Sequence, residues 1–143
     1  MPEIIDTFRG PYFFLSNFYY VPILLCDDIT YPTSEHAFQA QKTLDMNERQ
    51  RIANLATPRE AKRAGRVSIL RKGWDDVRID VMREIVRIKF KEDPMRERLL
   101  DTGDARLVEG NTWGDKFWGV YDGVGENHLG RILMRVRKEL QNG

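Results

Sequence analysis

Three polar side chains that could carry out acid–base and nucleophilic chemistry stand at helical spacing in the first third of the chain. Glu35, Gln39 and Lys42 occupy positions i, i+4 and i+7, and a rotation of about 100° per residue places them on one face of a helix. A carboxylate can move a proton, an amide can orient a substrate, and an amine can attack an electrophilic carbon. The same spacing also fits a polar stripe that faces solvent. The set is therefore a hypothesis for a catalytic surface.

The helix that must position this set has a clear start. Pro32 keeps the preceding chain extended, and Thr33 or Ser34 can accept hydrogen bonds from the first N–H groups. Glu35 then falls in the first turn, where the helix dipole favours an anion. We expect the helix to begin near Ser34 and to end at about Leu44.

The neighbouring segments predict further elements. Residues 21–31 are expected to form two strands around a turn at residues 26–28. A second helix is expected over residues 46–55, and a third begins at the capping box TPRE, residues 57–60. Small residues in this third helix suit close contact with another helix.

Two later helices follow from apolar periodicity. A helix beginning at Trp74 is expected to end before Asp93-Pro94, and a shorter one to cover residues 95–100. The last helix begins after Asn127, its expected N-cap. The residues expected in the core on the helix that begins at Trp74 are Trp74, Val77, Val81, Ile85 and Ile88, and those on the last helix are Leu129, Ile132 or Leu133, Val136 and Leu140.

The segment from Phe8 to Leu25 is crowded with aromatic residues. This composition predicts short strands joined by a turn, with most aromatic side chains in the core. Asn17 stands out, because an amide in an aromatic setting can bind a base or ribose edge. It could equally be a turn residue.

Residues 101–125 are rich in glycine and carry several indoles and carboxylates. Such a segment is a poor core and a plausible binding loop. Trp113 and Trp118 could stack on a planar ring or simply pack. Glu109 and Asp115 are candidate acids, although isolated carboxylates are commonly surface groups. Asn127 could meet a phosphate at the helix N-terminus.

The composition limits the alternatives. A chain of 143 residues with 41% hydrophobic content fits a single domain over residues 1–143. The net charge of +1 indicates no general nucleic-acid or membrane partner. One cysteine and two histidines show no metal-ligand pattern, and no leader or membrane span is evident. We expect a cytoplasmic protein without metal or cofactor.

Six segments in order carry a family resemblance: FRGPYFFLSNFY, YPTSEHAFQAQK, ATPREAKRAGR, VMREIVRIKF, LLDTGDARLVEGNTWGDKFWG and GENHLGRILMRVR. They resemble the successive motifs of the NADAR family, also called YbiA-like, and extend from Phe8 to about Leu140. Six ordered motifs are far more specific than any one of them. With the predicted elements, the resemblance implies a mainly helical α+β domain with a small antiparallel sheet from the N-terminal third.

The resemblance implies an N-glycosidase that hydrolyses the bond between a base-like nitrogen and a phosphorylated ribose. Family members are associated with removing ADP-ribose from modified guanine and with cleaving phosphorylated intermediates of riboflavin biosynthesis. The sequence does not choose between these substrates. If the guanine lies in DNA or RNA, arginines such as Arg63, Arg66 and Arg71 could contact the nucleic acid locally.

Two catalytic routes fit the residues. In one, Glu35 or Asp115 positions water while another acid protonates the leaving nitrogen. In the other, which we favour because only it uses the amine, Lys42 attacks the anomeric carbon and forms a Schiff base. The predicted catalytic residues are Glu35, Lys42 and Asp115. The predicted substrate-binding residues are Ser16, Asn17, Phe18, His36, Gln39, Arg66, Glu109, Asn111, Trp113, Trp118 and Asn127; the family pocket implies the first three.

A protein of a different class would use the same residues without chemistry. In a non-catalytic module for ADP-ribose or another nucleotide, Trp113 and Trp118 would stack on the base and arginines would hold the phosphates. Glu35 and Lys42 would then be a structural ion pair. Such a module would return its ligand intact, whereas an N-glycosidase would cleave it.

Overall fold

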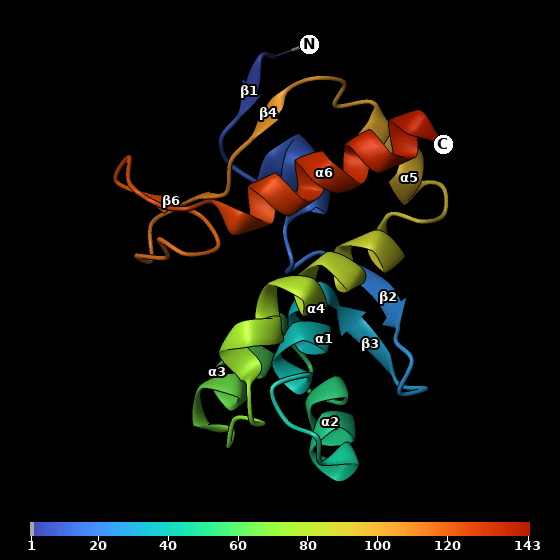
Figure 1. Ribbon diagram of the computed structural model, residues 1–143, viewed down its shortest axis with the longest axis vertical. Helices are drawn as coiled ribbons and strands as arrows, with labels where there is room; N and C mark the ends of the chain where they lie inside the picture. The colour runs from blue at the N-terminus through green and yellow to red at the C-terminus, as the bar shows by residue number, and fades with distance from the viewer. Residues whose placement is uncertain (1) are drawn as a thin grey trace. The chain divides into compact units, whose positions relative to one another are not determined.

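The structure is a computed structural model that describes residues 2–143 (Figure 1). Its elements, in chain order, are β1 (Ile4–Ile5), the 3-10 helix η1 (Gly10–Leu15), β2 (Tyr20–Leu24), β3 (Thr30–Thr33), α1 (Ser34–Ala40), α2 (Met46–Ala53), α3 (Pro58–Val67), α4 (Trp74–Lys89), α5 (Met95–Leu100), β4 (Arg106–Leu107), β5 (Gly110–Asn111), β6 (Val120–Tyr121) and α6 (His128–Asn142). Helices dominate and the strands are short, which confirms the expected α+β class.

The chain divides into two compact units. The α1 unit is Asn17–Lys89, with α1 to α4 and the strands β2 and β3. The α6 unit combines the residues up to Ser16 with Phe90–Gly143, and it holds η1, α5, α6 and the remaining strands.

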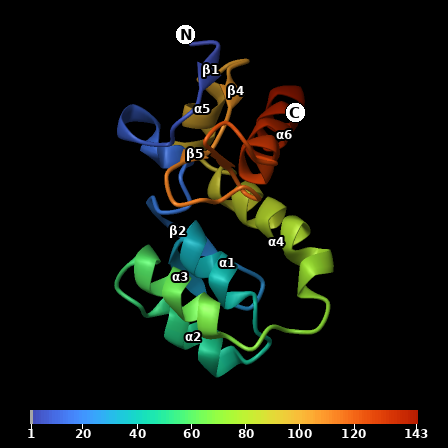
Figure 2. The same cartoon turned by 90° about the vertical axis from the view of Figure 1, so that its left-hand side faces the viewer.

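Helix α1 is the centre of its unit. It packs against α2, α3, α4 and both strands of the unit (Figures 1 and 2), and all of its residues are buried. The expected start is confirmed, because the Thr33 side chain caps the helix by accepting a hydrogen bond of 3.1 Å from the His36 N–H. The helix ends at Ala40, earlier than expected. Lys42 therefore lies in the following turn, where its N–H donates to the Gln39 carbonyl at 3.2 Å.

The expected strand pair is confirmed as an antiparallel hairpin of β2 and β3, with Ile23 opposite Tyr31. Its turn is closed from inside by Asp27, which accepts hydrogen bonds from the Tyr31 hydroxyl at 2.7 Å and from the Ile29 N–H at 3.0 Å. Arg49 of α2 forms an ion pair with the same carboxylate at 3.3 Å. This network ties the hairpin to α2.

The other helices of the α1 unit begin where the sequence predicted. The Thr57 hydroxyl accepts a hydrogen bond of 3.1 Å from the Glu60 N–H, which confirms the cap of α3. In α4 the apolar stripe was only partly right. Val77, Val81 and Ile88 are half-buried. The buried stripe consists of Trp74, Met82, Ile85, Val86 and Lys89, because the helix turns a face about one residue away from the predicted one toward its neighbours.

The α6 unit departs most from expectation. Residues 10–15 form a 3-10 helix rather than a strand, since Pro11 fits a helix start and cannot donate to a sheet. Phe8 and Phe14 are buried, but Phe13 is 41% exposed. Two parallel pairs were not expected: β1 with β4, which are far apart in sequence, and β5 with β6, which are separated by residues 112–119.

Helix α5 has the predicted bounds, and α6 carries most of the predicted stripe. Leu129, Leu133 and Val136 are buried, whereas Leu140 is half-buried. Asn127 occupies the N-cap position of α6 as expected, but in the left-handed region and without a side-chain hydrogen bond to the helix N-terminus. No helix among residues 2–143 combines the length and apolarity that a membrane span requires.

Candidate active site

The predicted site residues belong to both units. Those in the α1 unit are Asn17, Phe18, Glu35, His36, Gln39, Lys42 and Arg66. Those in the α6 unit are Ser16, Glu109, Asn111, Trp113, Asp115, Trp118 and Asn127.

Glu35 and Gln39 are buried on α1, with 8% and 6% of their surfaces exposed. Asn17 lies beside the start of this helix, because its carbonyl accepts a hydrogen bond of 3.0 Å from the Glu35 N–H. The Asn17 side chain reaches toward α4, where its amide lies 3.7 Å from the Met82 sulfur. Within this unit the fold thus brings Asn17 and Glu35 together across a gap in sequence.

Gln39 is in an unusual polar environment. Its Oε1 atom is buried and has no hydrogen-bond partner within residues 2–143. The carboxamide instead lies against Gly65 of α3. Buried acceptors are nearly always paired, so an unpaired one in a native structure requires an explanation.

Lys42 is partly buried in the turn after α1. Its Nζ lies 5.9 Å from the centre of the Phe38 ring, and the Arg71 N–H fixes the turn by donating to the Lys42 carbonyl at 2.7 Å. Burial lowers the pKa of Lys42 below its usual value, whereas the carboxylate of Glu35 opposes this shift. Three cations act with burial: Arg66, Arg78 and Lys62.

This cluster makes the turn a positive region around one carboxylate. Lys62 and Arg66 belong to α3 and Arg78 to α4. Guanidinium and ammonium groups bind phosphate well. Sequence reasoning missed Arg78, although a signal was present. It shares a helix face with the buried Trp74 and Met82 at i, i+4 spacing.

His36 has structural partners on both ring nitrogens. Nε2 lies 2.9 Å from the Leu55 carbonyl and therefore carries the proton, while Nδ1 lies 2.7 Å from the Thr33 hydroxyl, which donates to it. The residue is fully buried, and burial lowers the pKa of its imidazole. Its predicted contact with substrate stays a prediction, and its hydrogen bonds tie α1 to the end of the α2 segment.

In the α6 unit, polar side chains build the glycine-rich loop. The Asn111 amide donates to the carbonyls of Asp115 and Val120 at 2.8 and 3.2 Å, and its oxygen accepts from the Asp115 N–H at 3.0 Å. Asp115 Oδ1 accepts from the N–H groups of Phe117 and Trp118 at 3.0 and 2.9 Å. Both side chains hold loop backbone, and their predicted roles toward substrate stay predictions.

Asn127 also bonds to backbone rather than to the helix that it precedes. It accepts from the Glu109 N–H and donates to the Leu107 carbonyl, each at 3.0 Å. The two indoles differ: Trp113 is 53% exposed, while Trp118 is half-buried with its ring centre 4.9 Å from that of Phe117. Trp113 is therefore the more accessible ring of the loop.

The other predicted residues lie near the boundary of the units in sequence. Ser16 ends η1, and its N–H donates to the Phe13 carbonyl at 2.9 Å. Phe18 is half-buried in the α1 unit.

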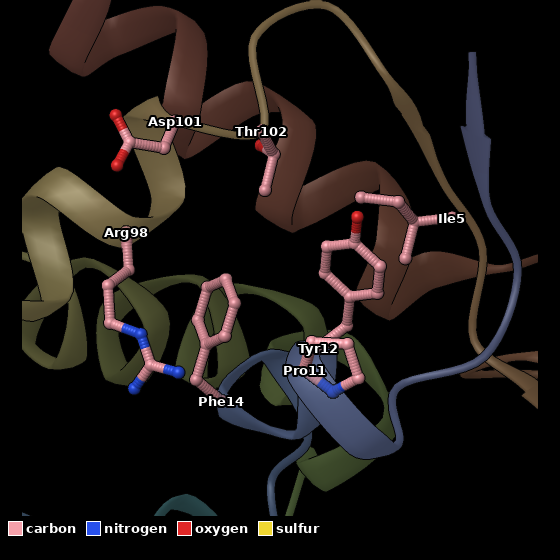
Figure 3. A pocket seen from close by; sticks show the side chains of 7 residues that line it. All are labelled: Ile5, Pro11, Tyr12, Phe14, Arg98, Asp101 and Thr102. Atoms are coloured by element: carbon pink, nitrogen blue, oxygen red, sulfur yellow. The ribbon is translucent and has the colours of Figure 1, made fainter. Parts of the chain in front are cut away.

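A small pocket of about 190 Å³ opens in the α6 unit (Figure 3). In its wall the Arg98 guanidinium lies over the Phe14 ring, 4.3 Å from the ring centre. The lining residues are Ile5, Pro11, Tyr12, Phe14, Arg98, Asp101 and Thr102. None of them belongs to the predicted site. Within residues 2–143 the structure also shows no cluster of His, Cys, Asp and Glu side chains suited to a metal ion.

Comparison with known proteins links this geometry to a family. A family model described as the NADAR domain matches residues 6–141. N-glycosidase YbiA of Escherichia coli strain K12 is 45% identical over 129 residues, which cover 87% of this chain and 79% of the relative. An N-glycosidase of Nostoc punctiforme is 43% identical over 139 residues, covering 92% of this chain and 88% of the relative.

Two further similarities extend this result. A riboflavin biosynthesis protein of Vibrio vulnificus is 43% identical over 132 residues, which cover 90% of this chain and 35% of that protein. The NMR structure of Escherichia coli YbiA superposes with a TM-score of 0.84 at 42% identity, covering 99% of this chain and 88% of that one. These relatives support N-glycosidase function in the family. The chain belongs to the NADAR family.

Proposed function

We propose that the protein is an N-glycosidase that cleaves the bond between a base-like nitrogen and a phosphorylated ribose, with Lys42 as the nucleophile. The names of its relatives support the N-glycosidase class. The observation that supports the nucleophile is the environment of Lys42: a partly buried amine with a lowered pKa, beside a buried carboxylate and three further cations.

A lysine attacks only as the neutral amine, so a lowered pKa increases the reactive fraction at neutral pH. Burial and the cations favour this form, whereas Glu35 favours the ammonium. The effect of Glu35 on the lysine is compatible with attack if Glu35 accepts the ammonium proton and then delivers it to the leaving nitrogen. In this role the carboxylate is both base and acid.

The proposed reaction balances with one water. The Lys42 nitrogen forms a bond to C1 of the ribose, the C1–N bond to the base breaks, and the leaving nitrogen takes a proton from Glu35. Opening of the ribose ring gives a protonated Schiff base between Lys42 and C1, and the ring oxygen takes the proton that the lysine nitrogen releases. Water then adds to C1, and the lysine amine departs to leave the free sugar.

The competing route uses water directly. Glu35 or Asp115 would position a water molecule against an oxocarbenium-like carbon while another acid protonates the base. Asp115 Oδ1 already accepts two backbone hydrogen bonds in its loop. Glu35 acts electrostatically on Lys42, which favours it over Asp115 as the working carboxylate.

The cations suggest which end of the substrate binds here. Lys62, Arg66 and Arg78 would bind the phosphate of the sugar, while Asn17 and Gln39 supply hydrogen-bonding groups near Glu35. Two substrates carry such a phosphorylated ribose: ADP-ribosylated guanine and a phosphorylated riboflavin precursor. The riboflavin biosynthesis relative supports the second, and the family resemblance supports both.

The test is to incubate the wild-type protein with ADP-ribosylated guanosine and, separately, with a phosphorylated riboflavin precursor. Release of the free base and of the sugar phosphate, followed by chromatography and mass spectrometry, is the expected result for at least one substrate. Tight binding with both ligands recovered intact would contradict the proposal and indicate a nucleotide-binding module.

A further inference from the structure

Gly65 and Gln39 meet at one close contact between α3 and α1. Gly65 is buried in α3, and Gln39 is buried in α1. A Cβ atom added at Gly65 would lie 1.7 Å from Gln39 Oε1 and 2.6 Å from its carboxamide carbon. Real Cβ contacts are never this short, so the Gln39 side chain occupies this place only because residue 65 has no side chain.

The backbone gives no other reason for glycine here. Gly65 lies inside a regular helix and is absent from the glycines with positive φ, so alanine could adopt the same backbone. Alanine would also stabilise the helix, because glycine loses more conformational entropy on folding. The glycine therefore serves the contact with Gln39.

The contact is unfavourable for Gln39 as well. Its Oε1 is buried without a hydrogen-bond partner among the described residues, and a buried unpaired acceptor lowers stability. A helix-destabilising glycine and a buried unpaired acceptor thus lie in contact, next to the proposed catalytic residues. Proteins keep such arrangements where function requires them.

We propose that Gly65 is a positioning residue, which acts through Gln39 to hold the carboxamide in the place needed to orient the substrate sugar for attack. This inference rests on the proposed function, because it gives Gln39 a role toward the substrate beside the proposed catalytic residues Glu35 and Lys42. With alanine at position 65 the carboxamide must leave the contact. A misplacement of about 1 Å can lower the rate by about 10²-fold.

The test compares Gly65→Ala, Gln39→Ala and the double variant. We expect Gly65→Ala to lower kcat/KM about 10²-fold and to act mainly on kcat, while the protein stays folded by circular dichroism. In the Gln39→Ala background the same substitution should change kcat/KM less than about twofold, because only a Cβ contact of 3.2 Å remains. Thermal melting should show the same coupling, with a larger loss when Gln39 is present.

Ala64→Gly is the matched control. It changes the preceding residue of the same helix, which lines a surface pocket with Leu55 and Val67 rather than the contact with Gln39. It should lower the melting temperature and leave kcat/KM unchanged. A folded Gly65→Ala protein with wild-type kcat/KM would overturn the positioning role alone, as would an equal loss in both backgrounds. Absence of turnover by the wild-type protein would overturn the proposed function and this role with it.

Discussion

The polar residues of α1 and those of the glycine-rich loop are buried in different ways. In the loop of the α6 unit, the side chains of Asn111 and Asp115 form hydrogen bonds with nearby backbone groups. On α1, Gln39 Oε1 has no such partner among residues 2–143, and in the turn that follows α1 Lys42 is partly buried among other cations. Side chains that satisfy their own loop stabilise structure, whereas buried polar groups left unsatisfied or electrostatically opposed are candidates for chemistry.

The largest effect is expected from the proposed nucleophile. Lys42→Ala should abolish turnover, because it removes the amine proposed to form the covalent intermediate. Lys42→Arg should not restore it, since a guanidinium stays protonated and cannot attack. Base release under single-turnover conditions measures both variants. Wild-type turnover by the alanine variant would contradict the covalent route.

A smaller loss is expected at the carboxylate. Glu35→Gln keeps the shape of the side chain but cannot accept or deliver a proton, and general acid–base catalysis typically contributes about 10²–10⁴-fold. We expect kcat to fall within this range. Asp115→Asn is the comparison, measured in the same assay. A larger loss of kcat for Asp115→Asn than for Glu35→Gln would assign the catalytic acid to the loop. It would contradict the difference drawn between the two regions.

For stability the order should be reversed: substitutions in the glycine-rich loop should cost more than substitutions on α1. Asn111→Leu leaves several backbone groups of the loop without partners and should lower the free energy of unfolding by about 2–4 kcal/mol. Gln39→Met removes an acceptor that has no partner in the described part of the chain and should change the free energy of unfolding by less than about 1 kcal/mol. Urea denaturation of both variants measures the difference. A larger loss for Gln39→Met would contradict the comparison.

The smallest effect concerns pH. The folded-state pKa of Lys42 is lowered, so between that pKa and the unfolded value of about 10.4 the unfolded chain binds more protons. Wild-type stability should therefore gain from raising the pH through this window. Lys42→Met lacks the buried charge and should be more stable than wild type at pH 7, with the difference shrinking toward pH 10.5. Melting curves over this range measure it, and a constant difference would contradict the assigned shift.

Much of the helical fold could be predicted because its signals are local. The cap at Thr33, the capping box at Thr57 and the break at Pro94 each depend on a few adjacent residues, and helices begin or end as expected there. The parallel pairs β1–β4 and β5–β6 could not be predicted, since each strand is only two residues long and its pairing depends on the folded path of the chain. The prediction of strands in the aromatic segment before Ser16 was wrong, because Gly10 and Pro11 favour a helical turn there despite the strand propensity of the aromatic residues.

In the candidate site, too, local features could be predicted from the sequence and tertiary contacts could not. Helical spacing placed Glu35 and Gln39 on α1, but it could not show that the helix stops before Lys42, which the turn and Arg71 decide. Nor could it show that Asn111 bonds to its own loop, because hydrogen-bond partners depend on the folded path of the chain. The small residues of α3, Gly65 among them, predicted close contact with another helix, but they could not show that Gln39 would be the side chain in contact.

The most direct test of the account is trapping of the intermediate on Lys42. Wild-type protein would be mixed with ADP-ribosylated guanosine or the phosphorylated riboflavin precursor, whichever it cleaves, in the presence of borohydride, which reduces a Schiff base to a stable amine. We predict a mass increase equal to the reduced sugar portion, located at Lys42 by peptide mapping and absent from Lys42→Ala. Base release at the normal rate without any trapped adduct would contradict the covalent route and assign the chemistry to a carboxylate and water.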